Sequence, residues 1–388
     1  MSDPAYFEAI AASLAGAGIA RPAIVLDLDA VDHNTALLLQ APGAAKLRIV
    51  TKSLPSRELV KYLLGQTGTR RLMAFHAPYL LWMLSELPDV DILMGKPFLP
   101  GVLQEMAART GVEGTQALAR QVQWLVDTPQ RLDEHAAFAR RHGVELRINI
   151  EIDVGLHRGG AADVSSLDVL LDGIDTQSDA LGFAGFMGYE AHVPFMPQPD
   201  TAFERSLSTY AEMVAFAESK YAHLIEATPT WNSGGSKTCW RFRADDSGSV
   251  VNDVAAGSAF VKPSTFEILS DYRPALFIAT PVIRKFARVS RRELDPAQST
   301  ALYLYGGGWA AELVHPAEVV SGPGGDPPNQ NLLPNQSLFL APGATKVEIG
   351  DYVFFVPHQG DAMFQFEDIH VLRGGSIIDT WKPFPLRY

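Results

Sequence analysis

The sequence is poor in cysteine and in positive charge, and it contains no long apolar run. Cys239 is its single cysteine, so no disulfide can form within the chain, as is typical of a reducing compartment. The net charge of -12 argues against nucleic acid or an anionic membrane as partner, because both favour a basic surface. No window approaches the roughly 18 apolar residues of a membrane span, and the N-terminus lacks the pattern of a signal peptide. We therefore expect a cytoplasmic protein.

The composition is that of a globular protein. Apolar residues make up 47% of the chain and charged residues 20%, which excludes a disordered polymer. A chain of 388 residues is too long for one ordinary core, so we expect one large domain and a smaller one.

Short apolar runs alternate with amphipathic stretches between about residues 45 and 260. An open doubly wound sheet would show the same alternation, but eight strands favour a closed (β/α)8 barrel, a TIM barrel, over residues 20–270. The predicted helices cover Ser56–Leu64, Gly101–Thr110, Pro129–His142, Ser166–Ile174 and Thr201–Lys220. The predicted strands are Lys46–Lys52, Arg71–His76, Val90–Lys96, Val122–Asp127, Leu146–Asp153, Leu181–Tyr189, Thr228–Gly235 and Val254–Phe260.

Residues 271–388 have a different pattern, with apolar runs separated by turns rich in Gly, Pro and Asn. This predicts a C-terminal all-β domain, which residues 1–19 could join. Ala23–Leu28 is a further strand that fits either domain, and a helix follows it near Asp29. The turn Ser321–Asn335 is a candidate lid or dimer contact. The predicted strands are Leu276–Val289, Thr300–Tyr305, Ser337–Leu340, Tyr352–Pro357, Met363–Leu372 and Ser376–Trp381.

Candidate site residues follow the predicted barrel strands, because active sites of such barrels lie at the C-terminal strand ends. Lys52 ends the first run, where its amine could act as a nucleophile or simply reach solvent. The seventh run ends in Asn232-Ser233-Gly234-Gly235-Ser236, and the eighth contains Gly257-Ser258. Glycines with small hydroxyl residues offer backbone N–H groups to a phosphate, and these two loops are the usual phosphate site of the fold.

Titratable groups also follow the fifth and sixth runs. They occur in Glu151-Ile152-Asp153-Val154-Gly155-Leu156-His157-Arg158-Gly159-Gly160 and in Gly188-Tyr189-Glu190-Ala191-His192. A structural alternative is that Asp153 pairs with Arg158 and that His192 only caps a loop. His135, His142 and His223 lie on helical stretches and are expected at the surface.

Taken in order, these motifs resemble a known family. Thr51-Lys52-Ser53, Asp153-Val154-Gly155 with Arg158-Gly159-Gly160, Gly188–His192 and Gly234-Gly235-Ser236 are similar to fold-type III enzymes that use pyridoxal 5'-phosphate (PLP). The D-threonine aldolase and D-serine dehydratase-like group, related to alanine racemase, is the nearest pattern. The resemblance covers nearly the whole chain.

The resemblance implies a role for each motif. Lys52 would carry PLP as a Schiff base, and Arg158 and Tyr189 would lie near the cofactor. His192 would be the base that acts on the substrate's β-hydroxyl, which suits an imidazole. The remaining cofactor-binding residues would be Asn232, Gly234, Gly235, Ser236, Gly257 and Ser258.

The resemblance also raises the question of a metal. Members of the group often bind a divalent cation through a C-terminal His followed two residues later by Cys or Asp. Here Gly360 occupies that position and Asp361 follows it, so the pattern is His-x-x-Asp with His358 as its first residue. Oxygen ligands beside His358 would suit Mn or Mg better than a thiolate site would, with Zn as a further candidate. The alternative is that His358 and Asp361 only form local hydrogen bonds.

Three functions are consistent with these residues. The first is a lyase for a D-configured 3-hydroxy amino acid, either an aldolase or a dehydratase. The second is an amino-acid racemase, which needs Lys52 and a second base; Tyr272, Tyr303 and Tyr305 are available but match no motif. The third is a non-catalytic PLP-binding protein, which the large C-terminal domain disfavours. Active sites of this fold type form between subunits, so the resemblance also implies a homodimer.

Overall fold

The computed structural model describes residues 3–40, 46–242, 249–287, 299–321, 332–333 and 335–385. The chain forms two compact units. The β unit contains Met1–Asn34, Pro55–Val60 and Ser258–Phe384, and the barrel unit contains Thr35–Leu54, Lys61–Gly257 and Pro385–Tyr388. Most of the turn Ser321–Asn335 lies outside the described residues.

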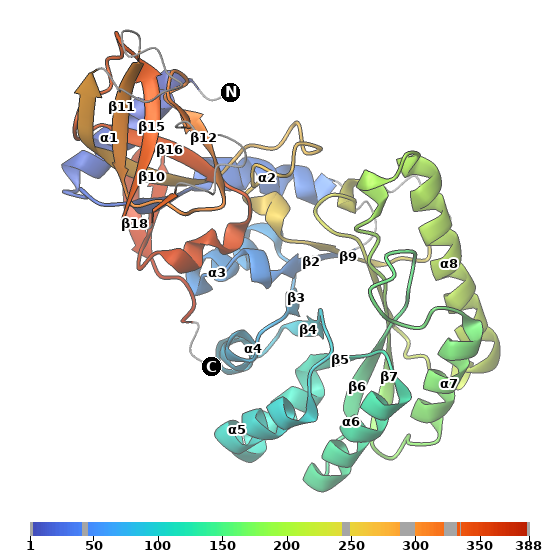
Figure 1. Ribbon diagram of the computed structural model, residues 1–388. Coiled ribbons are helices and arrows are strands. Elements are labelled where there is room, and N and C mark those ends of the chain that lie inside the picture. Colours follow the sequence, from blue (N-terminus) through green and yellow to red (C-terminus); the bar gives the residue numbers. More distant parts are fainter. Residues whose placement is uncertain are drawn as a thin grey trace. The chain divides into compact units, whose positions relative to one another are not determined.

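Eight parallel strands close into a barrel in the barrel unit, which confirms the predicted fold class (Figure 1). The ring closes where β9 pairs with β2, for example Val254 with Leu47. The strands are mostly continuous apolar runs, as expected when helices cover the outside and side chains fill the inside. Their bounds are β2 Lys46–Val50, β3 Arg71–Ala74, β4 Asp91–Met94, β5 Val122–Val126, β6 Leu146–Glu151, β7 Leu181–Met187, β8 Thr230–Ser233 and β9 Asp253–Ala256.

Local signals mark both ends of α6, one of the helices that accompany these strands. In α6 the side chain of Thr128 accepts from the Arg131 amide, Pro129 opens the helix, and Gly143 ends it in the left-handed conformation. Helix α4 was not predicted, because its sequence is apolar almost throughout and shows no clear period. The bounds are α2 Leu28–Gln40, α3 Arg57–Thr67, α4 Ala77–Glu86, α5 Pro100–Gln121, α6 Pro129–His142, α7 Val164–Asp175 and α8 Pro199–Lys220.

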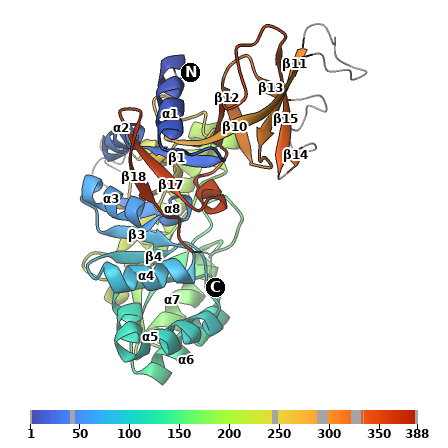
Figure 2. The same cartoon turned by 90° about the vertical axis from the view of Figure 1, so that its left-hand side faces the viewer.

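The β unit is built on one sheet, which confirms the predicted all-β domain (Figure 2). Its main path runs β13-β15-β11-β10-β1-β17-β18, and β16 joins β10 to β12. The long β10 pairs with β1 and β16 through its first part and with β11 through its second. The strands are β1 Ala23–Asp27, β10 Leu276–Ala287, β11 Ser299–Tyr305, β12 Ala311–His315, β13 Val320–Ser321, β14 Leu332–Leu333, β15 Gln336–Pro342, β16 Tyr352–Pro357, β17 Ile369–Arg373 and β18 Ser376–Trp381.

The β unit differs from the sequence prediction in several places, among them the strands β12, β13 and β14, which were not predicted. The strand expected over Met363–Leu372 is wrong in its first half, because Gly360–Gln365 forms a 3₁₀ helix and β17 begins only at Ile369. Helix α1, Pro4–Gly16, was not predicted. It packs on the sheet through Phe7, Ile10 and Leu14, which are buried together with residues of β1, β10 and β16. The N-terminus is thus part of the core of this unit.

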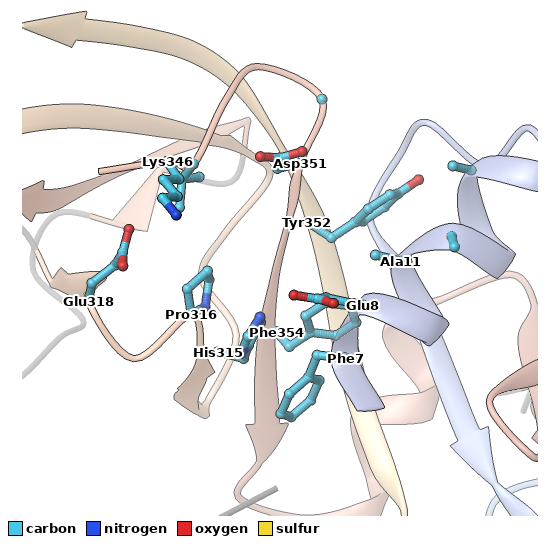
Figure 3. Close-up of a pocket in the computed structure, with 14 residues that line it drawn as sticks. Phe7, Glu8, Ala11, His315, Pro316, Glu318, Lys346, Asp351, Tyr352 and Phe354 are labelled. Atoms are coloured by element: carbon cyan, nitrogen blue, oxygen red, sulfur yellow. The ribbon is translucent and has the colours of Figure 1, made fainter. Parts of the chain in front are cut away.

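A cavity of about 480 Å³ lies beside α1 in the β unit (Figure 3). Phe7 and Glu8 of α1 line it together with His315 at the end of β12 and Tyr352 and Phe354 of β16. The His315 ring stacks on Phe7, with 4.7 Å between the ring centroids. No predicted site residue lines this cavity.

The prediction that His135 lies at the surface is wrong. Its side chain is 1% exposed within α6, and burial lowers its pKa from 6.5 to about 4. His142 and His223 are exposed, as predicted. The prediction missed that His135 occupies a core position of α6, where Leu132 and Phe138 are also buried.

The buried imidazole makes stability depend on pH. Because the folded-state pKa lies below that of the unfolded chain, the unfolded state binds the proton more tightly. The contribution of His135 is therefore complete above pH 6.5 and declines as the pH falls to about 4, a loss of about 3 kcal/mol. Denaturant midpoints across this range should fall less in His135→Leu than in the wild type. The exposed His142→Leu on the same helix should keep the wild-type slope, and equal slopes in all three proteins would contradict the prediction.

Candidate active site

The predicted site residues of the barrel unit follow the carboxyl ends of its strands. Lys52 lies in a short 3₁₀ helix, Thr51–Ser53, directly after β2. All eight strands are parallel in a closed barrel, so the segments that follow them share one rim. The other predicted residues on this rim, after β6, β7, β8 and β9, are Arg158, Tyr189, His192, Gly234, Gly235, Ser236 and Gly257.

His192 lies against the loop that follows β6. A Cβ atom built on Gly155, whose φ is +109°, would come within 3.0 Å of the His192 Nε2 atom. The His192 Nδ1 atom is buried and has no hydrogen-bond partner among the residues that the structure describes. The side chain also makes no capping bond to the 3₁₀ helix Val193–Phe195 that it precedes. The alternative that His192 only caps a loop is therefore wrong.

Arg158 is held between an acid and an aromatic ring. Its Nη2 atom donates to Glu151 Oε1 at 2.6 Å, and its guanidinium lies 5.3 Å from the centre of the Tyr189 ring. Burial and the nearby Glu190 raise the pKa of Tyr189, whereas Arg158 lowers it. The net shift is upward, so Tyr189 is a protonated phenol at neutral pH.

Asp153 does not pair with Arg158, so that alternative is also wrong. Its Oδ2 atom lies 2.8 Å from His157 Nδ1, and its Oδ1 atom accepts from the amides of Gly155 and His157, each at 2.9 Å. These bonds hold the pKa of Asp153 below its usual value although burial opposes them. Asp153 thereby shapes the loop that carries Arg158.

The glycines after β8 and β9 permit close approaches that no side chain would allow. A Cβ atom on Gly235 would lie 2.6 Å from the Tyr189 ring, and one on Gly257 would lie 2.5 Å from the Val50 carbonyl oxygen. The Gly257 amide donates to Ser236 Oγ at 3.1 Å. Short contacts therefore connect the loop after β6 to the loops after β7, β8 and β9 in turn. The last of them reaches Val50 at the end of β2, two residues before Lys52.

Several amides that the sequence predicted as phosphate donors also bond within the protein. The Gly234 amide donates to Glu190 Oε2 at 3.2 Å, and the Gly235 amide donates to Thr238 Oγ1 at 3.1 Å. Sequence reasoning did not assign Glu190 or Thr238 a role. The loop Ser233–Thr238 is thus internally ordered by side chains as well as by its glycines.

Two aromatic neighbours of Lys52 were likewise not predicted. The exposed Lys52 Nζ atom lies 4.8 Å from the centre of the Phe75 ring, which follows β3. Partial burial lowers the pKa of His76, and the positive charges of Lys96 and Lys52 add to this effect. Two lysines therefore face the same part of the rim, of which only Lys52 lies within a recognisable motif.

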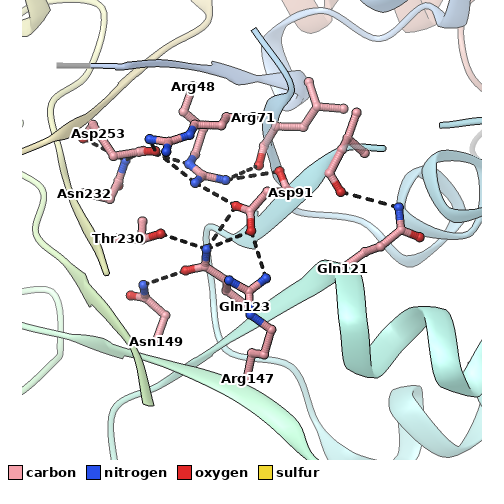
Figure 4. A network of polar contacts seen from close by, with 12 residues as sticks. Arg48, Arg71, Asp91, Gln121, Gln123, Arg147, Asn149, Thr230, Asn232 and Asp253 are labelled. Carbon is pink, nitrogen blue, oxygen red and sulfur yellow. Dashed lines mark hydrogen bonds and ion pairs between the residues drawn. The ribbon is translucent and has the colours of Figure 1, made fainter. Parts of the chain in front are cut away.

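The opposite end of the barrel holds a polar network (Figure 4). Arg48 is fully buried and donates to Asp253 at 2.7 and 2.9 Å and to Asp91 at 2.8 Å. Asp253 also accepts from Arg71 at 2.8 Å and from Asn232 Nδ2 at 2.6 Å. The side-chain amide of Asn232, predicted to bind cofactor, thus bonds inside the barrel, and its cofactor contact stays a prediction.

The remaining predicted residues belong to the β unit. Ser258 directly follows Gly257 and begins the 3₁₀ helix Ser258–Phe260. His358 Nδ1 lies 2.8 Å from Ser264 Oγ, and Asp361 stands in the first turn of the 3₁₀ helix Gly360–Gln365. Within the described ranges, no group of three or more His, Cys, Asp or Glu side chains is arranged to hold a metal ion.

The close approach of Gly257 to the Val50 carbonyl oxygen leads to a testable prediction. In Gly257→Ala the new methyl group would meet backbone at 2.5 Å, so the loop after β9 or the end of β2 must shift. We expect this variant to bind PLP, the cofactor that the resemblance implies, at least about 10-fold more weakly, a scale typical of displaced supporting groups. Gly65→Ala in helix α3, where a methyl group meets nothing within 4 Å, is the matched control and should bind as the wild type does. Equal affinities in both variants, measured by absorbance titration, would contradict the prediction.

Comparison with known proteins identifies the class. The family described as the alanine racemase N-terminal domain matches residues 26–259, and the chain belongs to this family. A curated relative, alanine racemase of Mycobacterium ulcerans (strain Agy99), is 30% identical over 138 residues. That alignment covers 36% of this chain and 34% of the relative, so it spans about a third of the relative's length.

Solved structures share the fold over nearly the whole chain. D-threo-3-hydroxyaspartate dehydratase from Delftia sp. HT23 has a TM-score of 0.73 at 19% identity and covers 93% of this chain and 97% of its own. D-threonine aldolase from Filomicrobium marinum has a TM-score of 0.71 at 16% identity, covering 94% and 96%. An alanine racemase from Bacillus anthracis with bound L-Ala-P has a TM-score of 0.67 at 15% identity, covering 94% and 98%.

The family consists of PLP-dependent enzymes that include lyases and racemases, and PLP is the cofactor expected for this fold. The rim fits such a group in two respects. It carries the amine of Lys52, and it leaves the buried Nδ1 of His192 without a partner in the described part of the chain. Among the described helices, none combines the length and apolar character needed to cross a membrane.

Proposed function

We propose that this chain is a PLP-dependent lyase for a D-configured 3-hydroxy amino acid. The observation that carries the proposal is the position of His192, whose imidazole lies against Gly155 with a buried Nδ1 that has no partner in the described structure. The similarity in fold to D-threonine aldolase and D-threo-3-hydroxyaspartate dehydratase supports the same reaction class.

Each rim residue has a task in this proposal. Lys52 would hold the cofactor covalently, and Arg158 would be presented to the cofactor by its bond to Glu151 and its stacking on Tyr189. When bound, PLP supplies an electron sink for the pair released at the substrate Cα atom. His192 would take the proton of the β-hydroxyl as the Cα–Cβ bond breaks, so that the β carbon leaves as an aldehyde.

The same imidazole could serve the dehydratase reaction. There the substrate would lose its Cα proton to a base, the imidazole would hand a proton to the β-hydroxyl as it leaves as water, and hydrolysis of the remaining C=N bond would give a 2-oxo acid and ammonia. The two reactions differ in their products, which makes the choice directly measurable.

The test begins with the absorption spectrum of the purified protein, before and after borohydride, and with peptide mapping of the reduced product. D-3-hydroxy amino acids are then assayed for glycine plus aldehyde and, separately, for 2-oxo acid plus ammonia. His192→Asn should lower turnover by about 10²- to 10⁴-fold, the usual contribution of a general base, while cofactor binding persists. A protein that takes up no added PLP would overturn the proposal, and full activity of His192→Asn would remove His192 from it.

A racemase is the second candidate, favoured by the identity to the alanine racemase of M. ulcerans. It would need a base opposite Lys52, which the resemblance implies comes from a partner subunit, so a homodimer is expected in either case. Sedimentation equilibrium tests the dimer. Conversion of one enantiomer of alanine to the other, without release of aldehyde or ammonia from hydroxy amino acids, would favour the racemase over the lyase.

We also propose that His358 and Asp361 bind a divalent cation together with water. In support, the Ser264 hydroxyl lies 2.8 Å from His358 Nδ1, and such a bond commonly orients a ligating imidazole so that Nε2 faces the ion. Equilibrium dialysis against Mn²⁺ should show one bound ion per chain after EDTA treatment, lost in His358→Ala. The exposed His142→Ala is the control, and stoichiometric binding by His358→Ala would rule out this site.

A further inference from the structure

Glu190 is the least expected feature of the rim. Glu190 is 1% exposed, yet among the residues that the structure describes no arginine or lysine forms an ion pair with it. Instead its oxygens accept from three groups of one loop. Oε2 accepts from Ser233 Oγ at 2.6 Å and from the Gly234 amide at 3.2 Å, and Oε1 accepts from the Thr238 hydroxyl. A buried carboxylate satisfied by neutral donors is unusual, because burial of an ionised group is costly without strong hydrogen bonds.

The hydrogen bonds around Glu190 continue into the loop Ser233–Thr238. The Ser233 and Thr238 hydroxyls both donate to its carboxyl oxygens. The Thr238 oxygen then has lone pairs for the Gly235 amide, which donates to it at 3.1 Å. The Gly235 carbonyl accepts from the amides of Thr238 and Cys239, at 2.9 and 2.7 Å. Glu190, in the loop after β7, therefore holds the Gly234 amide directly and the Gly235 amide through Thr238.

Glu190 also couples this loop to the other rim residues. It directly follows Tyr189, whose ring lies where a Cβ on Gly235 would stand. Its carbonyl accepts from the Val193 amide at 3.0 Å, in the turn that contains His192. The segment Tyr189–His192 thus contacts the loop after β8 on one side and, through His192, Gly155 after β6 on the other.

We propose that Glu190 is a positioning residue that orders the loop Ser233–Thr238 for the phosphate group of the cofactor. This inference rests on the proposed function, because it takes PLP as the ligand. Glu190 itself does not touch the phosphate. It binds the Gly234 amide directly and the Gly235 amide through the Thr238 hydroxyl, and in this proposal it thereby presents Ser236 and Lys237 to the ligand.

The test uses the apoprotein and two ligands that differ only in the phosphate, PLP and pyridoxal. Glu190→Ala should raise the Kd for PLP by about 10- to 100-fold, the range typical when a supporting partner is removed. The Kd for pyridoxal should stay at its wild-type value, because the lysine and the ring contacts are unchanged. Glu190→Gln should be intermediate, since its amide nitrogen can satisfy the Thr238 oxygen while its carbonyl still accepts from Gly234.

A second pair of variants covers the case in which Glu190→Ala does not fold. Thr238→Val removes the side-chain hydroxyl at nearly constant shape and should weaken the binding of PLP but not of pyridoxal. Thr238→Ser keeps the hydroxyl and should bind both ligands as the wild type does. Glu218→Ala, an exposed acid of helix α8, is the control for loss of charge. Suppose that the wild type binds PLP. The inference alone is then overturned if the Glu190 and Thr238 variants bind PLP as well as the wild type does, or if they lose PLP and pyridoxal in parallel. A wild type that binds neither ligand would overturn the proposed function instead.

Discussion

Lys52→Ala is expected to lower kcat/KM by more than about 10⁴-fold, the scale of losing a covalent catalytic group. The cofactor would lose its covalent attachment, and borohydride would then fix no label at this position. The physical reason is positional: Lys52 directly follows β2, and contacts from β6 to β9 end at Val50, two residues before it. Activity assays and peptide mapping of the reduced protein are the measurements.

Lys96 is the matched control for this variant. It follows β4, is exposed, and has its Nζ atom 5.6 Å from the Phe98 ring, much as Lys52 lies over Phe75. Both lysines depress the pKa of His76. Lys96→Ala should keep the label on Lys52 and most of the activity. A label on Lys96 in the wild type would show that the covalent attachment has been assigned to the wrong lysine.

Asp253→Leu is expected to destabilise the barrel by about 3–5 kcal/mol, because it leaves a buried guanidinium without its main partner. Burial alone would lower the pKa of Arg48, but Asp253 and Asp91 raise it, so Arg48 stays charged. Neither the Arg48 nor the Asp253 side chain has any solvent exposure. The measurement is the shift of the denaturant midpoint followed by circular dichroism.

Two further variants identify the cause of that loss. Arg48→Met combined with Asp253→Leu should recover part of the stability, since the double variant no longer buries an unpaired charge. Asp179→Asn, which breaks the exposed pair with Arg140, should leave the midpoint unchanged. A double variant less stable than Asp253→Leu would show that the network contributes net stability beyond charge compensation.

The sequence predicted the barrel because its evidence is local. Each strand is a run of apolar residues bounded by turn residues, and the helix Pro129–His142 carries its own start and stop signals, so its observed bounds match the prediction. The rim was predictable for a related reason. In a parallel barrel every strand ends on the same side, so residues next to strand ends meet whatever their distance in sequence.

The features that the sequence did not predict are not local, because they depend on partners far away in the chain. Arg48 lies in an apolar run, and its partner Asp253 is 205 residues further on. The carboxylate of Glu190 bonds to Ser233 and Thr238, 43 and 48 residues away. No local pattern distinguishes a charged residue that meets such a partner inside the fold from one that faces solvent.

By itself, then, the sequence determined the parallel barrel, the following β sheet and the order of the chemical groups on the rim. Apolar periodicity and turn residues act over a few positions, and a short segment carries them completely. Only the tertiary structure decided that His135 is buried, that α1 completes the core of the β unit, and that Glu190 orders the loop after β8. Whether a side chain is buried, and which groups it hydrogen-bonds to, depends on residues that are distant in sequence and come together only when the strands pair.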